Sequence, residues 1–366
     1  MRSTLRSDAL ASYAGQFVWL ELNYDDPRNA AFLTTHLGSA FPVLTIIDPT
    51  TEQATGVWTG GGSAPGIASF LDDVLARPRD DADALLGRAE GLLGGGDAAG
   101  AVKLYDAAIA AGGAGWSRHD HAIETLVGAL QVSDAHTCVT RAAAEAPKLP
   151  RAHPFINVVV TGVSCLQGDP PGLTSEDGKR LVSLANEALA MPNASEDDHY
   201  QLFEALYAIA AADPAASKAV TARYLAFIDQ LPPWRSDDER MARDLALLRA
   251  TVKAGVPERA IPVLEASERA LPDDDNASAR LATAYTAARR YADAIAACTR
   301  GLARKPGPTA TARFLGSRAT AEATLGDAAA ATRDLASALA AAAQITVRDQ
   351  REMTQQQLQH QLDALH

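Results

Sequence analysis

The feature that most constrains the fold is a pattern in residues 249–306 that repeats with a period of 34. Ala260 and Ala294 are 34 positions apart, and so are Pro272 and Pro306. A chain that repeats itself every 20 to 50 residues or so is built from stacked copies of one small unit. The fold therefore depends on how each copy buries its apolar face against the next copy.

The apolar residues of one copy fall on single sides of helices. Ala294, Cys298 and Gly301 are spaced at i, i+4 and i+7, so they share one side of a predicted helix. Small residues there let two antiparallel helices approach closely. Pro306 then ends the helix because proline lacks an N–H group. This pattern resembles the tetratricopeptide repeat (TPR), which implies helix pairs that stack into a solenoid.

Further copies are predicted over most of the chain. Ala101 and Ala135 are again 34 positions apart, in register with the later pairs. We expect about seven helix pairs over residues 82–344, because a single pair cannot bury its apolar stripe alone. Residues 345–366 are expected to form a capping helix with one apolar stripe and a polar back. Residues 77–81 are expected to be a short linker.

Residues 1–76 have a different pattern, which predicts an α/β domain. Runs of β-forming residues, glycine breaks and an amphipathic segment alternate there. The predicted fold class is therefore α/β plus all-α. The expected elements are a helix over 7–13, strands at 17–23, 41–47 and near 53–59, a helix that starts at 25–27 and runs to about 37, and a helix over 64–75.

Three stretches of this first domain resemble the thioredoxin family. Residues 17–25 are similar to the family's strand that ends in an acidic pair, and Phe41-Pro42 is similar to the start of its cis-proline strand. Residues 58–62 look like its final strand and glycine corner. The resemblance implies a thioredoxin-like domain that lacks its first strand and its redox Cys-x-x-Cys motif, which should lie upstream of residues 1–13.

Two hypotheses explain the missing motif. One is that Met1 is an internal methionine and that the gene product begins upstream. The other is a genuinely reduced, redox-inactive domain, since natural domains manage exposed sheet edges in several ways.

The charge of the chain limits its partners. The formal net charge is −12 and the pI is about 5.1. Nucleic acids and anionic membranes bind basic faces, and no Lys/Arg cluster here is dense enough to form one. The first residues do not resemble a signal peptide, and the longest apolar tract is shorter than the roughly 20 residues of a membrane span. We expect a cytoplasmic protein, or a periplasmic or membrane-anchored one if an upstream signal segment is missing.

The residue types that bind metals or carry out catalysis show no recognisable motif. Cys138, Cys165 and Cys298 are widely separated, so we expect small buried side chains rather than disulfides, zinc ligands or reactive thiols. Residues 119–121, His-Asp-His, resemble a metal site but lack a third ligand nearby. The sequence therefore predicts no metal, no cofactor and no catalytic residue.

Two groups of residues are candidates for partner binding. Phe41, Pro42 and Trp58 could form an apolar patch, with core packing as the alternative for the two aromatic residues. Arg249 and Lys253 lie one turn apart on a predicted first helix, where they could meet a peptide carboxylate on the concave face of the repeats. The alternative is that this basic pair is only solvated.

Two functional hypotheses follow. The first is a non-catalytic protein–protein interaction scaffold, built from a thioredoxin-like remnant and TPR repeats, that binds a protein or peptide. The second is that the full-length gene product is a thiol–disulfide oxidoreductase whose TPR region recruits client proteins. Thiol exchange needs a low-pKa thiolate beside a resolving cysteine, and none of the three cysteines offers this. The first hypothesis is therefore the one that applies to this chain.

Overall fold

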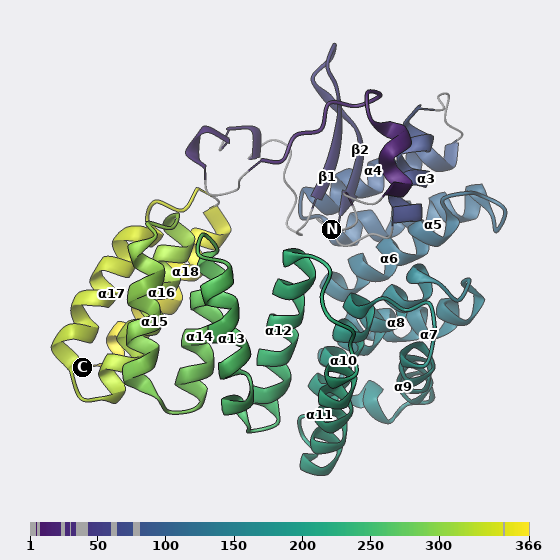
Figure 1. The fold of residues 1–366 in the computed structure, drawn as a ribbon. Helices are drawn as coiled ribbons and strands as arrows, with labels where there is room; N and C mark the ends of the chain where they lie inside the picture. The colour runs from purple at the N-terminus through teal and green to yellow at the C-terminus, as the bar shows by residue number, and fades with distance from the viewer. Residues whose placement is uncertain are drawn as a thin grey trace. The chain divides into compact units, whose positions relative to one another are not determined.

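The computed structural model is mainly α-helical, with one small β-hairpin near the N-terminus (Figure 1). Contacts within the chain divide it into two compact units. Unit 1 comprises Met1–Trp19 and His36–Val220, and unit 2 comprises Leu20–Thr35 and Thr221–His366. The structure describes residues 5, 8–22, 26–29, 31–33, 43–59, 64–75, 81–346 and 348–365.

Unit 1 begins with a 3-10 helix, a β-hairpin and one α-helix. The 3-10 helix η1 spans Asp8–Tyr13, strand β1 spans Val43–Asp48 and strand β2 spans Gln53–Thr59. The two strands are antiparallel, and helix α3, Ala64–Leu75, follows them. The predictions of these two strands and of α3 are confirmed.

The strand predicted at 17–23 is wrong over its described residues. Only Phe17 makes a bridge there, to Ala14, and Val18 is 88% exposed. A run of β-forming residues needs a neighbouring strand to complete its hydrogen bonds, and the residues that the structure describes supply none for this run. The described sheet therefore has two strands, which is not the arrangement that the thioredoxin resemblance implies. Of the helix predicted to end at 37, the structure describes only the 3-10 turn η2, Pro27–Asn29, and residues 31–33.

The hairpin and α3 share a small apolar core with η1. The Tyr13 hydroxyl donates hydrogen bonds to the Ala68 carbonyl oxygen at 2.9 Å and to Asp72 Oδ1 at 2.6 Å. The Asp72 carboxylate raises the pKa of Tyr13 to about 12. A two-stranded hairpin is only marginally stable alone, so it depends on these helices. The buried apolar residues of this core are Leu10, Tyr13, Ile46, Trp58, Ile67, Phe70, Leu71 and Val74.

The rest of the chain is a series of helix pairs. Of the linker expected at 77–81, only Asp81 is described, and it is the first residue of α4. The α-helices are α4 Asp81–Gly94, α5 Ala98–Gly112, α6 His119–Ser133, α7 Ala135–Glu145, α8 His153–Cys165, α9 Glu176–Leu189, α10 Glu196–Ala210, α11 Pro214–Asp229, α12 Asp237–Lys253, α13 Ile261–Ala270, α14 Asp275–Ala287, α15 Tyr291–Ala303, α16 Pro308–Thr324, α17 Ala328–Ala342 and α18 Arg348–Asp363.

Short polar residues explain where many of these helices begin. A side-chain oxygen at the N-cap accepts a hydrogen bond from a backbone N–H that the helix itself leaves unpaired. Ser195 and Asp198 form a complete capping box at the start of α10, in which each side chain binds the other residue's backbone N–H. The N-cap residues whose side chains accept such a bond are Asp97, Asp134, Ser175, Ser195, Ser236, Asp274 and Asp327.

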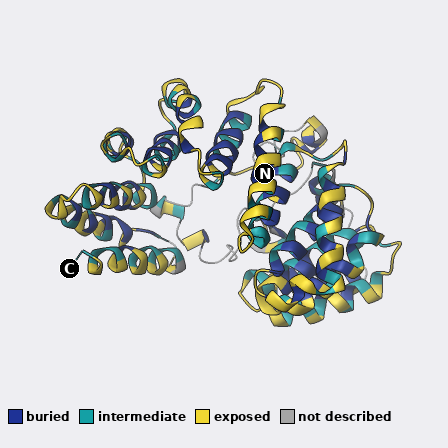
Figure 2. Ribbon diagram, turned by 90° about the horizontal axis from the view of Figure 1, so that it is seen from below, coloured by how far each residue is buried: buried dark blue, intermediate teal, exposed yellow. Residues whose placement is uncertain are grey.

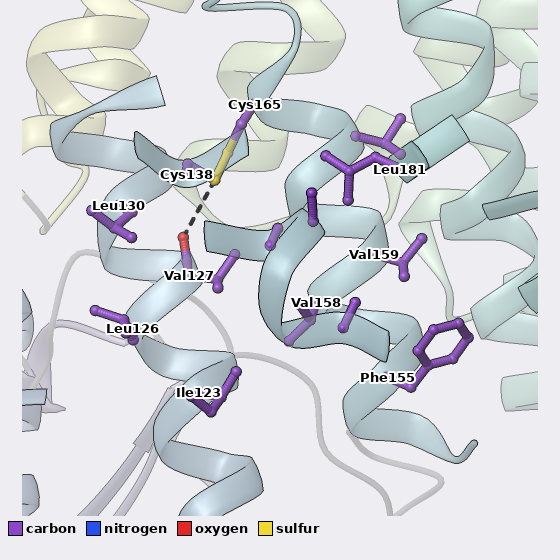
Figure 3. Packing of buried hydrophobic residues seen from close by; sticks show 14 of the residues in the cluster. Ile123, Leu126, Val127, Leu130, Cys138, Phe155, Val158, Val159, Cys165 and Leu181 are labelled. Atoms are coloured by element: carbon purple, nitrogen blue, oxygen red, sulfur yellow. Dashed lines mark hydrogen bonds between the residues drawn. A yellow bond between two sulfur atoms is a disulfide. The ribbon is translucent and has the colours of Figure 1, made fainter. Parts of the chain in front are cut away.

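Buried residues lie on the sides of the helices that face other helices (Figure 2). In unit 1 the largest core cluster runs from α4 to α10, and Figure 3 shows the part around α6, α7 and α8, with Leu181 of α9 beside them. A disulfide bond joins Cys138 of α7 to Cys165 of α8 there, with the two Cα atoms 6.2 Å apart. The prediction that these cysteines are unpaired is wrong. Stacking brings α7 and α8 together although the cysteines are 27 positions apart.

In unit 2, helix pairs approach closely where small residues were predicted to allow it. Ala294, Cys298 and Gly301 of α15 are all buried. A Cβ atom built on Gly301 would lie 2.3 Å from Cζ of Phe314 on α16. This position therefore needs glycine because of the neighbouring helix. Helix α18 adds Leu358, 4% exposed, to a core formed with α16 and α17.

Replacing Gly301 with alanine is expected to destabilise unit 2 by about 1–3 kcal/mol, because the added methyl group must displace the Phe314 ring. The matched control is Gly128→Ala in α6, where an added Cβ meets nothing within 4 Å. That change should stabilise its helix by about 0.5–1 kcal/mol through helix propensity. Urea denaturation followed by circular dichroism would measure the free energy of unfolding of both variants. Changes of the same sign would contradict the explanation that Phe314 makes the difference between the two glycines.

Candidate functional site

The first helices of neighbouring pairs contact one another, so they form a continuous surface in each unit. In unit 1 these helices are α4, α6, α8 and α10, and in unit 2 they are α12, α14 and α16. We call the two surfaces the first-helix face of unit 1 and the first-helix face of unit 2. Both carry charged side chains from several helices.

Trp58 of the β-hairpin packs against the first-helix face of unit 1. Its ring is stacked on that of His121 of α6, with centroids 4.0 Å apart, and meets Phe70 edge-on at 5.8 Å. Trp58 is only 5% exposed. It therefore serves core packing, and does not present a free apolar patch in this structure. Phe41 and Pro42, predicted to share that patch, lie outside the described residues.

Beneath this contact lies a buried ion pair. Arg118 Nη2 is 3.2 Å from Glu90 Oε1, and the two side chains are 3% and 2% exposed. His121 Nε2 is 3.0 Å from the same carboxylate oxygen. The Arg118 guanidinium also lies 5.7 Å from the centroid of the Phe70 ring. This cluster ties the hairpin and α3 to α4 and α6.

A second polar network crosses α6, α8 and α10. Asn157 Nδ2 donates to Glu124 Oε1 at 2.6 Å and lies 2.9 Å from His153 Nε2. His153 Nδ1 lies 3.0 Å from Asp198 Oδ1. The backbone N–H of Ser195 donates to the other oxygen of Asp198 at 2.9 Å. Three successive helix pairs are thus joined through side chains.

Burial and hydrogen bonding change the proton affinities in this network. Burial raises the pKa of Glu124. Burial alone would lower the pKa of His153, but the Asp198 carboxylate outweighs it and raises this pKa. Burial would raise the pKa of Asp198, but the hydrogen bonds from His153 and Ser195 lower it. Asp198 therefore stays ionised, while Glu124 and His153 hold protons more readily than usual.

Arg249 and Lys253, the predicted partner-binding pair, lie on α12 in unit 2. Arg249 is exposed and forms no hydrogen bond or ion pair with the described part of the chain. Lys253 is half-buried in the last turn of the helix. A cation at a helix C-terminus interacts favourably with the helix dipole. Arg249 is thus the member of the pair that is open to a partner.

Two further arginines belong to this surface. Burial lowers the pKa of Arg280 on α14, and the neighbouring charges of Asp274 and Asp244 oppose that shift. The positive charges of Arg313 on α16 and of Arg249 lower the pKa of Arg280 further. Cations from α12, α14 and α16 therefore act on one another across the first-helix face of unit 2.

The remaining candidates for chemistry do not form a reactive site. Burial raises the pKa of the free thiol of Cys298 to about 11, so it is a poor nucleophile. His119 Nδ1 lies 3.3 Å from Asp120, whereas His121 turns to Glu90. Among the described residues, no three His, Cys, Asp or Glu side chains are placed to hold a metal ion. None of the helices in the described ranges is long and apolar enough to cross a membrane.

Sequence reasoning missed these networks, although it contained a signal for them. Glu124 and Asn157 are 33 positions apart, and Glu90 and His121 are 31 apart. Both separations are close to the repeat period of 34. Side chains one period apart occupy equivalent places on stacked pairs. A search for complementary polar residues at about that separation would have found these two pairs.

Two solved structures are similar to parts of this chain. A tetratricopeptide repeat protein from Parabacteroides merdae aligns with a TM-score of 0.46 and 11% identity, over 76% of this chain and 98% of that one. The TPR2AB domain of yeast Sti1, in a complex with pHSP90, aligns with a TM-score of 0.28 and 15% identity, over the same shares of the two chains. No family model and no curated protein matches the chain. The helix pairs of the chain itself are therefore the basis for describing it as TPR-like.

Proposed function

We propose that this chain is a non-catalytic scaffold that binds an acidic peptide or protein segment on the first-helix face of unit 2. The observation that supports this is Arg249, an exposed guanidinium without a partner among the described residues, beside Lys253 on α12. Guanidinium groups bind carboxylates with two parallel hydrogen bonds, which favours a carboxylate ligand.

The surrounding charges support an anionic partner. The whole chain carries a formal charge of −12, so a group of cations on one face is a local exception. Arg313 is held by the Asn276 side chain at 3.2 Å and by Asp275 at 3.5 Å, and both of these residues lie at the start of α14. Arg249 makes no such contact with the described residues. An anion bound there would relieve the repulsion among the cations of α12, α14 and α16.

The Arg249→Glu/Lys253→Glu variant is expected to bind a fluorescein-labelled hexaglutamate peptide at least about tenfold more weakly than the native chain. Reversing two charges replaces attraction by repulsion, and tenfold corresponds to only about 1.4 kcal/mol. Fluorescence anisotropy at low and at physiological salt would measure the affinity, since surface attraction weakens with salt.

The control variant carries the same change of charge on second helices. Lys103 of α5 and Arg269 of α13 are both exposed, and Lys103→Glu/Arg269→Glu should leave binding close to native. If both double variants lost binding equally, only the net charge of the protein would matter. If the native chain bound hexaserine as well as hexaglutamate, the proposal would be wrong.

The thiol–disulfide oxidoreductase hypothesis receives no support from the described residues. Cys138 and Cys165 are joined and buried, and Cys298 is a buried thiol of raised pKa. The described sheet is a two-stranded hairpin, whereas the thioredoxin resemblance implies at least three strands. The scaffold is therefore the function that we propose for the chain.

A further inference from the structure

The hydrogen bonds between α6, α8 and α10 limit where the protons of these side chains can lie. The Asn157 carboxamide nitrogen contacts Glu124 Oε1 at 2.6 Å and His153 Nε2 at 2.9 Å. An amide NH₂ group can only donate, so both of the atoms that it contacts must accept a hydrogen bond. Glu124 accepts through Oε1, which it does most strongly as a carboxylate, and His153 is neutral with its proton on Nδ1, where it donates to Asp198. The three helices lie side by side in unit 1 (Figure 1).

Protonation of His153 cannot leave this arrangement unchanged. A proton on Nε2 would place an N–H group against the NH₂ group of Asn157, so two donors would face each other. Turning the carboxamide over presents Oδ1 to His153 instead. Oδ1 then also faces the Glu124 carboxylate, so two acceptors meet on that side. The charge-assisted hydrogen bond from Asn157 to Glu124 is lost.

A second proton removes the conflict. If Glu124 is also protonated, its O–H donates to Asn157 Oδ1, and the same oxygen accepts from His153 Nε2–H. A carbonyl oxygen has two lone pairs, so it can accept both bonds. The contacts of Asn157 with Glu124 and with His153 then each join a donor to an acceptor again. The network thus has two arrangements, two protons apart, in which both contacts of Asn157 join a donor to an acceptor.

We propose that Asn157 is a proton-operated switch, whose carboxamide turns over when Glu124 and His153 each take up a proton in one step. Both protons come from solvent, one forming an O–H bond on Glu124 and one an N–H bond on His153. The charge of the first-helix face of unit 1 rises by two. This inference is independent of the proposed function, which concerns unit 2.

The charges around the switch act in both directions. Asp197 and Asp198 of α10 face His153 and favour its charged form. His121 of α6 lies near Glu124 and favours the carboxylate, as a charged His153 also would. The attraction between a charged His153 and the Glu124 carboxylate acts against joint uptake of the two protons, because it keeps Glu124 ionised. The partial burial of Glu124 acts in favour of joint uptake, because a carboxylate that is partly removed from water is costly when it loses its donor. The raised pKa values of Glu124 and His153 agree with joint uptake.

Nuclear magnetic resonance of the whole chain between about pH 5 and 8 tests the switch, because histidine titrates in this range. The carboxyl carbon of Glu124 and the ring of His153 are expected to share one midpoint, with a Hill coefficient approaching about 2 for the coupled pair. The side-chain NH₂ signals of Asn157 should move at the same midpoint. Separate midpoints, or Asn157 signals that do not move, would overturn the proposal.

His136 is an internal control in the same sample. It contacts Asp169 through Nδ1 at 2.9 Å, and its pKa is raised by that carboxylate. Among its described contacts, no amide side chain links His136 to a second carboxyl group, as Asn157 links His153 to Glu124. The Hill coefficient of the His136 titration should therefore be about 1. In a Glu124→Gln variant the second proton cannot bind, and His153 should titrate with the slope of His136 at a lower midpoint. An unchanged His153 curve in this variant would also count against the switch.

Discussion

Replacing Arg118 with methionine is expected to destabilise unit 1 by about 3–5 kcal/mol. The guanidinium lies 3.2 Å from Glu90, and both side chains are at most 3% exposed. Methionine fills much of the same space but leaves the carboxylate buried with His121 alone. Taking a charge out of water without a full set of partners is among the costliest single changes in a protein. Urea denaturation followed by circular dichroism would measure the loss.

A half-exposed arginine in the same unit provides the comparison. Arg141 pairs with Asp106 at 3.0 Å, and these side chains are 32% and 47% exposed. Arg141→Met should therefore cost less than about 1 kcal/mol. The double variant Arg118→Met/Glu90→Met should recover much of the loss, because no buried charge remains unpaired. If Arg118→Met and Arg141→Met lowered the free energy of unfolding equally, burial of an ion pair would not determine its contribution to stability.

The helix pairs were predictable because their determinants are local and repeated. The spacing of Ala294, Cys298 and Gly301 placed small residues on one side of a helix, and Phe314 packs directly on that side. Helix periodicity and proline stops act within one repeat, so one copy suffices to recognise them. Stacking then follows from the need to bury each apolar stripe.

The strand predicted at 17–23 shows the limit of this reasoning. Its residue types favour a strand, but β propensity describes a side chain that packs on a half-buried sheet. The described residues around Val18 offer no such neighbour, and Val18 stays exposed. The hairpin from Val43 to Thr59 was predicted correctly because each of its strands supplies the partner of the other. A strand is predicted securely only together with its partner.

The polar networks could not be read from local pattern because their members lie on different repeats. His153 and Asp198 are 45 positions apart, and Arg118 and Glu90 are 28 apart. Each pair is joined only when helix pairs stack in the correct order. Insertions in the middle of the chain lengthen the repeat period there. Sequence separation therefore indicates the contact between Glu124 and Asn157 better than the contact between His153 and Asp198.

The Cys138→Ala/Cys165→Ala variant is expected to lower the stability of unit 1 by about 3 kcal/mol. The disulfide bond closes a loop between positions that are 27 apart, and this restricts the unfolded chain. A loop of this length falls in the usual range of about 2–4 kcal/mol. Urea denaturation with and without dithiothreitol would measure it, since the reductant should weaken the native chain and leave the variant unchanged.

Cys298→Ala is the matched control, because this thiol is buried but has no sulfur partner. It removes one small side-chain atom without opening a loop, so it should cost less than about 1.5 kcal/mol. Unfolded, non-reduced protein should react with one equivalent of a thiol reagent, at Cys298. Three reactive thiols would contradict the disulfide bond directly.

Because the disulfide bond is buried, it should resist reducing agents as long as unit 1 is folded. Cys138 and Cys165 are at most 2% exposed, and Cys138 Sγ lies 3.7 Å from the Val127 carbonyl oxygen within the core shown in Figure 3. A reductant must attack a sulfur atom directly, so the folded unit should be reduced far more slowly than the unfolded chain. Structural disulfide bonds persist in oxidising compartments and are rare in the cytosol. Counting the thiols of protein extracted from its native compartment would therefore show whether the bond forms there.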